Sequence, residues 1–184
     1  MRDCERYLVD PYRFLPLEDE DLEWFLAVRN ASRESLHDDR EFGGASAREW
    51  FTTNKSSYLG IHTQDSLIGY FRLGDVEVRQ GKRLQWIGAD IDPRHRRNGH
   101  AFDSYRQLMD STVRDGRADG FILRVLPANL PAQMLYRKLG FVTTWIQTAL
   151  VQEQRGLLVS DIEMVSLPDM QPIDLIQLVH AGWR

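Results

Sequence analysis

The sequence predicts an α+β fold, with a mixed, mainly antiparallel central sheet and flanking helices. Runs typical of strands and of helices follow one another in the order β-α-α-β-β-β-α-β-α-β-β. Three consecutive strands are separated only by turn-forming residues, which favours an antiparallel meander. A helix and another strand follow the last of these three, and such a crossover favours a parallel pair within the sheet.

The N-terminal part of the chain predicts one strand and two helices. Residues 12–17 have the pattern of a short strand, and the acidic run 18–21 follows where the first turn of a helix favours carboxylates. Leu22 and Phe25 then begin an apolar stripe at helical spacing that faces the core. The letters SARE at 46–49 have the spacing of a capping box and predict the start of the second helix.

The middle and C-terminal parts supply the remaining elements. The run FILRVL is almost entirely apolar, which is typical of a strand buried in a parallel pairing. The predicted elements are strands at 58–63, 67–78 and 83–91, a helix from Ala101 to near Gly116, a strand at 121–126, a helix at 129–139 that Gly140 ends, and strands at 141–151 and 156–167.

Composition and charge exclude several classes of protein. With 184 residues, of which 42% are hydrophobic, we expect one globular domain with a sizeable core. The net charge of −4 argues against polyanion binding, so no nucleic acid is expected as a partner. The single cysteine, Cys4, excludes a disulfide and a cysteine-based zinc site, and the histidines show no metal-ligand spacing. No segment fits a signal peptide or a membrane span, so we expect a cytoplasmic protein without metal or membrane partner.

The segment 168–184 is predicted to be a helical tail on a main domain of residues 1–167. Pro168 and Pro172 end the preceding strand, and a short helix after them needs a surface to pack against. The tail therefore either folds back on its own domain or contributes to a homodimer interface. We expect the homodimer, because the predicted domain is complete without the tail. The apolar residues of the tail are Ile173, Ile176, Leu178, Val179 and Trp183.

A basic loop, DPRHRRNGHA at 92–101, stands out in an otherwise acidic chain. A solvated run of charge is one interpretation. The alternative follows from its position between a strand and a helix, because the N–H groups at a helix N-terminus bind phosphate oxygens. Gly99 and Ala101 let the backbone approach such an anion closely. A pyrophosphate is the ligand expected from this pattern, on the backbone of Arg96, Arg97, Asn98, Gly99, His100 and Ala101.

A second motif, NLPAQMLYRKLGF, opens the helix that follows the next strand. Together with R-x-x-G-x-A in the basic loop, it resembles the GNAT superfamily of acyl-CoA N-acyltransferases over roughly residues 10–167. Arg97 departs from the pattern, because the family often has glycine there. The residues that match the second signature are Asn129, Ala132, Leu135, Tyr136, Lys138, Leu139, Gly140 and Phe141.

The resemblance implies the GNAT fold, in which the parallel strands 83–91 and 121–126 splay apart, and an acetyl-CoA-dependent transfer of acetyl to an amine. It places the pyrophosphate on the basic loop and the pantetheine along Ala89, Asp90 and Ile91. It also assigns the cofactor side of the following helix to Asn129, Ala132, Tyr136 and Lys138. Without a ligand, Asn129 would be a helix N-cap and Lys138 an exposed lysine.

The resemblance further implies catalytic roles. Tyr136 matches the tyrosine that acts as general acid near the CoA sulfur, although its apolar stripe would also suit a core aromatic. A protonated amine must lose a proton before it attacks, so a base is expected as well. Asp90 is the first candidate for this base and Glu77 the second. Asp90 could equally be a hydrogen-bonded structural carboxylate.

The acceptor side is implied to lie in residues 27–51, which resemble the branch of ribosomal-protein N-terminal and nucleotide-linked amino-sugar N-acetyltransferases. Its candidate substrate-binding residues are Arg29, Asn30, His37 and Asp38, with Asp39 and Arg40 beside them. Three functions follow. The first is acetylation of a small-molecule amine such as an amino sugar or nucleotide-linked amine. The alternatives are a protein N-terminal acetyltransferase and a CoA-binding module without catalysis.

Overall fold

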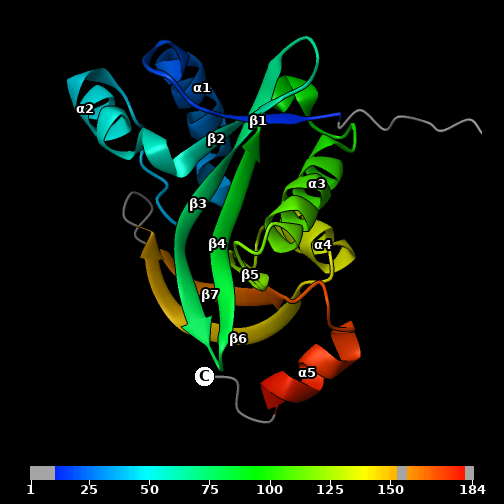
Figure 1. Ribbon diagram of the computed structural model, residues 1–184. Coiled ribbons are helices and arrows are strands. Elements are labelled where there is room, and N and C mark those ends of the chain that lie inside the picture. The colour runs from blue at the N-terminus through cyan, green and yellow to red at the C-terminus, as the bar shows by residue number, and fades with distance from the viewer. Residues whose placement is uncertain (1–10, 153–156, 181–184) are drawn as a thin grey trace, which may run out of the picture.

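A computed structural model describes residues 11–152 and 157–180 of the chain (Figure 1). Its strands are β1 (Arg13–Pro16), β2 (Tyr58–His62), β3 (Leu67–Arg79), β4 (Lys82–Ile91), β5 (Gly120–Val125), β6 (Val142–Gln152) and β7 (Leu157–Ser166). Its α-helices are α1 (Leu22–Ser32), α2 (Gly44–Asn54), α3 (His100–Arg114), α4 (Leu130–Lys138) and α5 (Pro172–His180). Cys4 and Trp183 lie outside the described residues.

The strands form one sheet in the order β1-β2-β3-β4-β5-β7-β6. Every recorded pairing is antiparallel except that of β4 with β5. The predicted mixed α+β fold is therefore confirmed, including the meander of β2, β3 and β4 and the parallel crossover through α3. The last two strands enter the sheet out of chain order, because β7 lies between β5 and β6.

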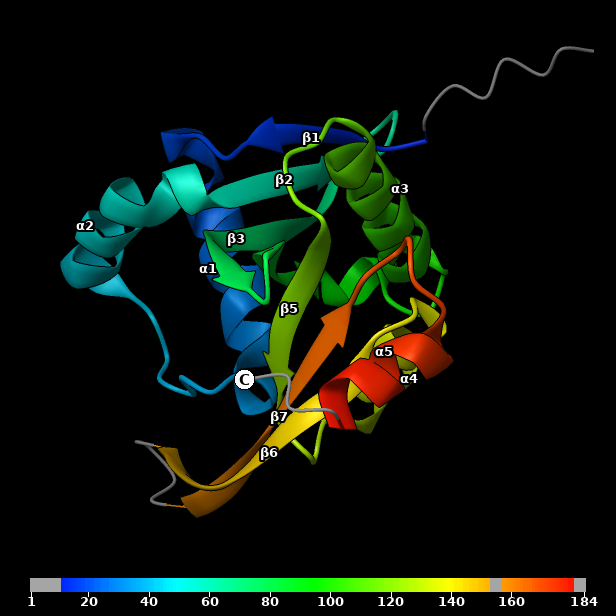
Figure 2. The same ribbon diagram turned by 60° about the horizontal axis from the view of Figure 1, so that its bottom comes forward.

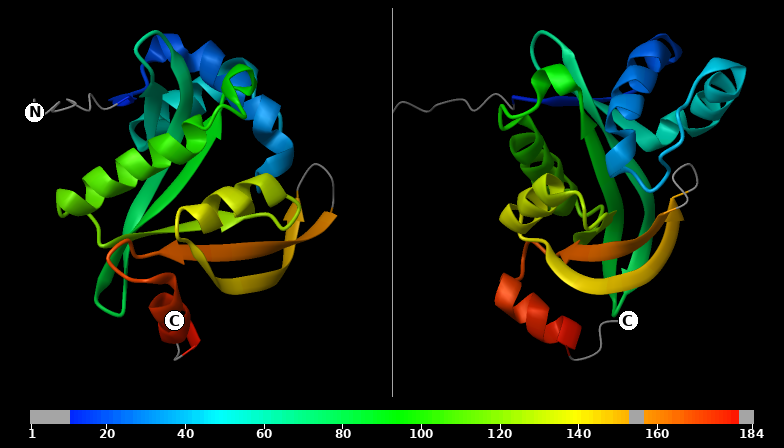
Figure 3. Two further views of the ribbon diagram at one scale, coloured as in Figure 1. Left: turned by 90° about the vertical axis from the view of Figure 1, so that its right-hand side faces the viewer. Right: turned by 180° about the vertical axis from the view of Figure 1, so that it is seen from behind.

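Helices cover both faces of the sheet, as the two views of Figure 3 show. On one face, α3 and α4 pack on a core that includes Phe71, Tyr105, Phe121 and Tyr136. On the other face, α1 and α2 cover only the end of the sheet near β2 and β3, around Phe25. At the opposite end of this second face, Leu175 of α5 packs on Leu84, Ile122 and Val165 of β4, β5 and β7, so α2 and α5 lie far apart (Figure 2). Polar residues, among them Arg72 and Arg124, lie between these two ends.

The parallel strands β4 and β5 pair over a short stretch only. Their ladder runs from Leu84 to Trp86 on β4 and from Gly120 to Ile122 on β5. Both strands continue beyond it, to Ile91 and Val125, without pairing to each other. An opening therefore forms between them, at the ends of the strands that lead to α3 and α4.

Two local predictions near the N-terminus need correction. The predicted capping box at 46–49 does not start a helix, because α2 begins at Gly44. Ser46 lies within its first turn, where its hydroxyl donates to the Gly43 carbonyl at 3.4 Å. The glycine pair turns the backbone earlier than the motif predicted, with Gly44 at a φ of +68°. The acidic run forms a separate 3₁₀ turn, Asp19–Asp21, before α1.

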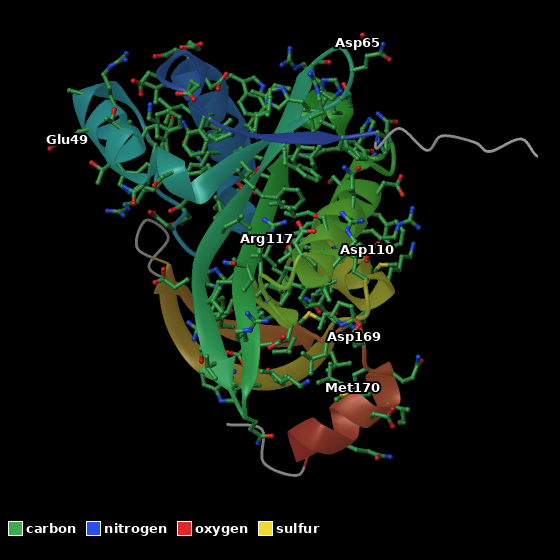
Figure 4. The ribbon with its side chains drawn as sticks, in the orientation of Figure 1. Glu49, Asp65, Asp110, Arg117, Asp169 and Met170 are labelled. Carbon is green, nitrogen blue, oxygen red and sulfur yellow. The ribbon has the colours of Figure 1, made fainter. Side chains whose placement is uncertain are left out.

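The tail folds back on the domain through α5. Leu175 is 1% exposed and packs with Leu84, Ile122, Val165 and Leu167. Met170, labelled in Figure 4, packs against the same cluster from the segment that precedes the helix. Ile173 remains exposed. No helix in the described ranges has the length and apolar character needed to cross a membrane.

Candidate active site

A cavity of about 310 Å³ lies where β4 and β5 separate. We call it the central cavity. From the helical face it is lined by Tyr105 of α3 and by Ala132, Leu135 and Tyr136 of α4. From the opposite face it is lined by His37, Arg72, Trp86 and Arg124. The opening between the two strands thus connects the apolar face of the sheet with its polar face.

A second cavity of about 540 Å³, the loop groove, continues from the first toward α3. The basic loop lines it through Arg96, Arg97, Gly99, His100 and Ala101. The two cavities share eight residues, which makes them one continuous depression: Ser35, Ala89, Asp90, Ile91, Ala101, Asn129, Ala132 and Leu135. This shape suits an elongated molecule with an anionic end in the groove and a narrow end between the strands.

The backbone of the basic loop forms a concave turn before α3. Gly99 has a φ of +83°, which a residue with a side chain adopts only with strain. Arg97 has a φ of +64° and tolerates that strain at the position where the resemblance expects glycine. The N–H groups of Arg97, Asn98 and Gly99 donate no hydrogen bond within the described part of the chain. They are therefore available to an anion.

Two arginines of the loop bind other groups of the protein through their side chains. Arg96 turns back, and its guanidinium donates to the Ile91 carbonyl and to the Ser32 hydroxyl, both at 2.8 Å. Its backbone N–H donates to the Pro93 carbonyl at 3.4 Å, so the predicted anion contact of this N–H is not available. Arg94 binds Asp92 through Nη2 at 2.7 Å. Asn98 lines neither cavity by its side chain.

Asp92 holds the start of the loop in place. Its carboxylate caps the short 3₁₀ helix Pro93–His95 by accepting the Arg94 N–H at 2.9 Å. It also accepts the indole N–H of Trp24 at 3.2 Å. The Arg94 guanidinium is the main reason that the pKa of Asp92 falls from 3.8 to about 2. Asp92 is therefore an anion at neutral pH that fastens the loop to α1.

Tyr136 reaches the central cavity from α4 and is 8% exposed. Its ring meets that of Tyr105 edge-on, with 5.8 Å between the centroids. Burial raises the pKa of the Tyr136 hydroxyl above its usual value. The hydroxyl is therefore protonated at neutral pH and is chemically able to give its proton to a strongly basic leaving group.

Asp90 and Arg72 face each other in the central cavity. The Arg72 Nη2 atom lies 3.5 Å from Asp90 Oδ2, which is an ion pair longer than a hydrogen bond. Asp90 is 8% exposed, and its Oδ2 has no hydrogen-bond partner among the described residues. The carboxylate is therefore buried, and one of its oxygens is available to a ligand.

Glu77 lies elsewhere on the polar face. It accepts from Arg79 Nε at 2.6 Å and from the Trp86 indole at 3.0 Å, and it does not line the central cavity. The bond from Arg79 is the main reason that the pKa of Glu77 is lowered. The structure therefore brings Asp90, and not Glu77, into one cavity with Tyr136.

The start of α4 also faces both cavities. Asn129 caps this helix by accepting the Ala132 N–H at 3.2 Å, and both residues line the central cavity and the loop groove. The N-cap interpretation of Asn129 therefore applies, and it does not prevent contact with a ligand. Lys138 is exposed at the far end of the helix, beside Phe102 and Leu135.

Of the four predicted substrate-binding residues, only His37 lines the central cavity. Arg29 donates to the carbonyls of Arg40 and Asp38, and its guanidinium stacks 3.8 Å from the centre of the Phe42 ring. Asn30 exchanges two hydrogen bonds with the backbone of Phe42, at 2.8 and 2.9 Å. These side chains hold the α1–α2 connection in shape.

Asp38 and Asp39 do not line the central cavity either. Asp38 binds the Arg40 guanidinium at 2.9 Å, and Asp39 is buried. The connection instead reaches β7 through His37, whose Nε2 lies 2.7 Å from Asp161 Oδ1. Asp161 is fully buried.

Sequence reasoning missed three charged residues of this region, namely Arg72, Arg124 and Asp161. Arg72 and Arg124 interrupt mainly apolar runs, YFRLG and FILRVL, and Asp161 alternates with apolar residues in VSDIEMV. The same signal identified Asp90. A charged residue in an apolar strand is expensive to bury without a partner, so each of these positions was a candidate for the site.

Comparisons with known proteins identify the family and the fold of the chain. The family described as "Acetyltransferase (GNAT) domain" matches residues 13–142. No curated protein matches the chain. Among solved structures, a GNAT acetyltransferase from Bacillus anthracis is 13% identical, with a TM-score of 0.74 over 87% of this chain and 96% of its own.

Two further structures share the fold. The protein yncA from Salmonella typhimurium, solved with its cofactor acetyl-CoA, is 16% identical, with a TM-score of 0.64 over 87% of this chain and 96% of its own. A ribosomal-protein-alanine N-acetyltransferase from Brucella melitensis is 16% identical, with a TM-score of 0.67 over 85% of this chain and 98% of its own.

Proposed function

The chain belongs to the GNAT acetyltransferase family, and from this premise we propose that it acetylates the primary amine of a small molecule, such as an amino sugar or a nucleotide-linked amine. Membership makes the chain an acetyl-CoA-dependent N-acetyltransferase, so a CoA-binding module without catalysis is set aside. The acceptor class and the site residues are our proposals.

The observation that carries the proposal is the continuity of the two cavities through the opening between β4 and β5. The loop groove offers the N–H groups of Arg97, Asn98 and Gly99 and the first turn of α3, which suit a pyrophosphate. The central cavity offers the backbone of Ala89 to Ile91, which suits the pantetheine. Lys138 would lie near the nucleotide end, beyond Phe102.

The residues around the strand end suit the proton transfers of the reaction. When bound, acetyl-CoA supplies the acetyl group and a thiolate leaving group. Asp90 lies in the same cavity and takes a proton from the attacking amine, directly or through water. Tyr136 stays protonated because burial raises its pKa, and it gives a proton to the leaving sulfur.

A protein N-terminus is the second candidate acceptor. It is supported by the sequence resemblance and by the shared fold of the Brucella melitensis ribosomal-protein enzyme. The acceptor side of the central cavity is bounded by the α1–α2 connection at His37 and by Arg124 of β5. We propose the cytoplasm as the compartment, where acetyl-CoA and either acceptor would be available.

The assay incubates the purified chain with acetyl-CoA and a panel of amines, and it follows thiol release. The panel contains amino sugars, nucleotide-linked amines, amino acids and short peptides with free N-termini. Calorimetry with CoA runs in parallel and reports cofactor binding separately from transfer. Thiol release with a small amine above the rate without acceptor supports the proposal. CoA binding with release only for peptides favours the second candidate.

A further inference from the structure

Two arginines in the central cavity donate no hydrogen bond within the described part of the chain. They are Arg72 and Arg124, whose side chains are 40% and 44% exposed. Each has one ion pair of 3.5 Å, to Asp90 and to Asp161 respectively. The Nε atom of Arg72 is buried and has no hydrogen-bond partner among the described residues. Together the two guanidinium groups hold ten N–H donors.

Other arginines with buried contacts behave differently. Arg29 donates two hydrogen bonds, Arg79 donates three and Arg96 donates two. Buried donors in native proteins are paired with few exceptions, because an unpaired donor loses its bonds to water without replacement. Donors that face a cavity and lack protein partners therefore indicate a bound ligand or water.

The sheet register places the two arginines on the same face of the sheet. Arg72 pairs with Gly88 across the β3–β4 ladder. Trp86 pairs with Ile122 at the end of the β4–β5 ladder, and Arg124 follows two residues later, where β4 and β5 separate. Side chains two residues apart on a strand share a face, so both guanidinium groups project to the polar face. Both arginines line the central cavity there.

Gly88 makes room for the Arg72 guanidinium beside β4. A Cβ atom at this position would lie 3.1 Å from Arg72 Nη2 and 3.4 Å from its Cζ. Any larger residue would therefore press on the guanidinium and displace it within the cavity.

The neighbours of Arg124 hold its guanidinium in place but do not use all of its N–H donors. Its guanidinium lies 5.3 Å from the centre of the Trp86 ring, a cation–π contact. Glu163 is its partner across the β5–β7 ladder, but Arg79 already binds this carboxylate at 2.7 and 3.1 Å. Asp161 is held by His37 through its other oxygen. The terminal nitrogens of Arg124 therefore remain available.

Two carboxylates accompany the two guanidinium groups. Asp90 Oδ2 and Asp161 Oδ2 are both buried, and neither has a hydrogen-bond partner among the described residues. Of the two, Asp90 lines the central cavity, which therefore offers a carboxylate beside two guanidinium groups. Such a mixture is complementary to a molecule that carries both an ammonium and an anionic group.

We propose that the acceptor is a small amine that also carries a carboxylate or phosphate, which Arg72 and Arg124 bind. This inference rests on the proposed function and specifies its substrate class. The amine lies toward Asp90, and its nitrogen forms the bond to the acetyl carbon while the C–S bond breaks and its electron pair goes to sulfur. The ammonium nitrogen loses two protons: one leaves to solvent before the attack, and the other balances the proton gained by sulfur. The anionic group is unchanged and serves recognition.

The same donors discriminate against a peptide N-terminus. A peptide has an amide carbonyl where a free amino acid has its carboxylate. Hydrogen bonds between a guanidinium and an anion contribute about 1.5–3 kcal/mol, against roughly 0.5–1.5 kcal/mol for a neutral acceptor. The chain should therefore prefer the free acid over its amide.

The test compares acceptors that differ only in the anionic group. L-leucine is compared with L-leucinamide and 3-methylbutylamine, and O-phosphoethanolamine with ethanolamine. We expect kcat/KM to be about 10- to 100-fold higher for the anionic member of at least one set, in line with one or two charge-assisted bonds. The set with the larger ratio identifies carboxylate or phosphate as the preferred anion.

Variants link the preference to the cavity. Arg124→Gln should reduce the ratio of anionic to neutral acceptor toward one, mainly through KM of the anionic acceptor. Arg117→Gln is the matched control, because Arg117 is exposed after α3 and lines neither cavity (Figure 4). CoA affinity by calorimetry checks that each variant is folded. Arg72→Gln gives an independent second variant.

The outcomes separate this inference from the proposed function. Transfer to amines with a ratio near one in both sets would overturn the anionic acceptor and leave the acetyltransferase intact. A ratio that Arg124→Gln and Arg72→Gln leave unchanged would overturn the assignment to these arginines. CoA binding without transfer to any small amine of the wider panel would instead overturn the proposed function.

Discussion

Tyr136 and Asp90 enter the central cavity from different elements, the helix α4 and the strand β4. Both side chains are buried. The neighbouring residues of α4 and β4 that line the cavity are mostly apolar. A hydroxyl can donate a proton and a carboxylate can accept one, which suits these two side chains to opposite proton transfers.

Replacement of Tyr136 by phenylalanine should lower kcat by about 100-fold, the scale of a lost general acid. The ring and its contact with Tyr105 are kept, so the dissociation constant of CoA should not change. Steady-state kinetics and calorimetry measure the two quantities. Tyr58→Phe is the control, because Tyr58 is buried in the cluster of α1 and α2 and lines neither cavity. An unchanged kcat would make Tyr136 a core aromatic.

Asp90→Asn should lower kcat/KM by about 100-fold, whereas Glu77→Gln should have a much smaller effect. Asp90 lies in the cavity with an unpartnered oxygen, and Glu77 is bound by Arg79 and Trp86 outside it. Both substitutions remove a charge and keep the size of the side chain. Kinetics with one acceptor at one pH compare them directly. A larger loss in Glu77→Gln would reverse the order of the two candidates.

The loop between β4 and α3 is the element on which cofactor binding depends in our proposal. Its shape comes from Asp92 at its start and from the left-handed backbone of Arg97 and Gly99 near its end. Substitutions of Gly99 and of Asp92 test the two ends of this loop separately.

Gly99→Glu should raise the dissociation constant of CoA by about tenfold or more, because it places a negative charge where phosphate binds. Gly99→Ala separates this effect from backbone strain. Its Cβ meets only Asp103 Oδ2, at 3.6 Å, so the left-handed φ is the main cost. Calorimetry with CoA compares both variants. Equal affinities of Gly99→Glu and the wild type would contradict the loop assignment.

Asp92 makes the stability of the loop depend on pH. Its pKa is lowered from 3.8 to about 2 in the folded chain, so its contribution is present above about pH 4 and is lost as the pH falls toward 2. Asp92→Asn should therefore lower the free energy of unfolding at pH 7, and the difference from the wild type should shrink between pH 4 and pH 2. Urea unfolding at several pH values measures this. A difference that stays constant would contradict the ion pair with Arg94.

In the whole molecule, the tail after residue 167 packs against β4, β5 and β7 through α5. Leu175 fills a small cluster with β4, β5 and β7, while Ile173 and Ile176 keep exposed area that suits a second chain. The tail therefore packs on its own domain, and the homodimer stays a prediction. The division of the chain at residue 167 stays a prediction as well.

Deletion of residues 169–184 should lower the free energy of unfolding by about 2 kcal/mol or more, because Leu175 no longer covers its cluster. We also expect it to convert a homodimer into a monomer. Urea unfolding measures the first effect, and light scattering measures the second. A dimer that survives the deletion, or a full-length monomer, would count against the tail as an oligomerisation element.

The sequence by itself determined the element order, the parallel crossover and both motifs, because all of these depend on residues close together in the chain. Periodicity predicts a helix or strand wherever neighbours share a face, and Gly99 and Asn129 mark helix starts locally. The sequence did not predict that β7 inserts between β5 and β6, because the pairing of distant strands depends on the packing of the whole sheet.

Only the tertiary structure decided which charges meet at the acceptor side. Arg29, Asn30 and Asp38 are polar enough to bind a substrate, yet they satisfy the backbone and side chains of their own connection. Arg72 and Arg124 lie 52 positions apart, and they line one cavity because they project to the same face of the sheet where β4 splays from β5. A side chain's partners depend on which strands are neighbours, and that is a property of the folded sheet.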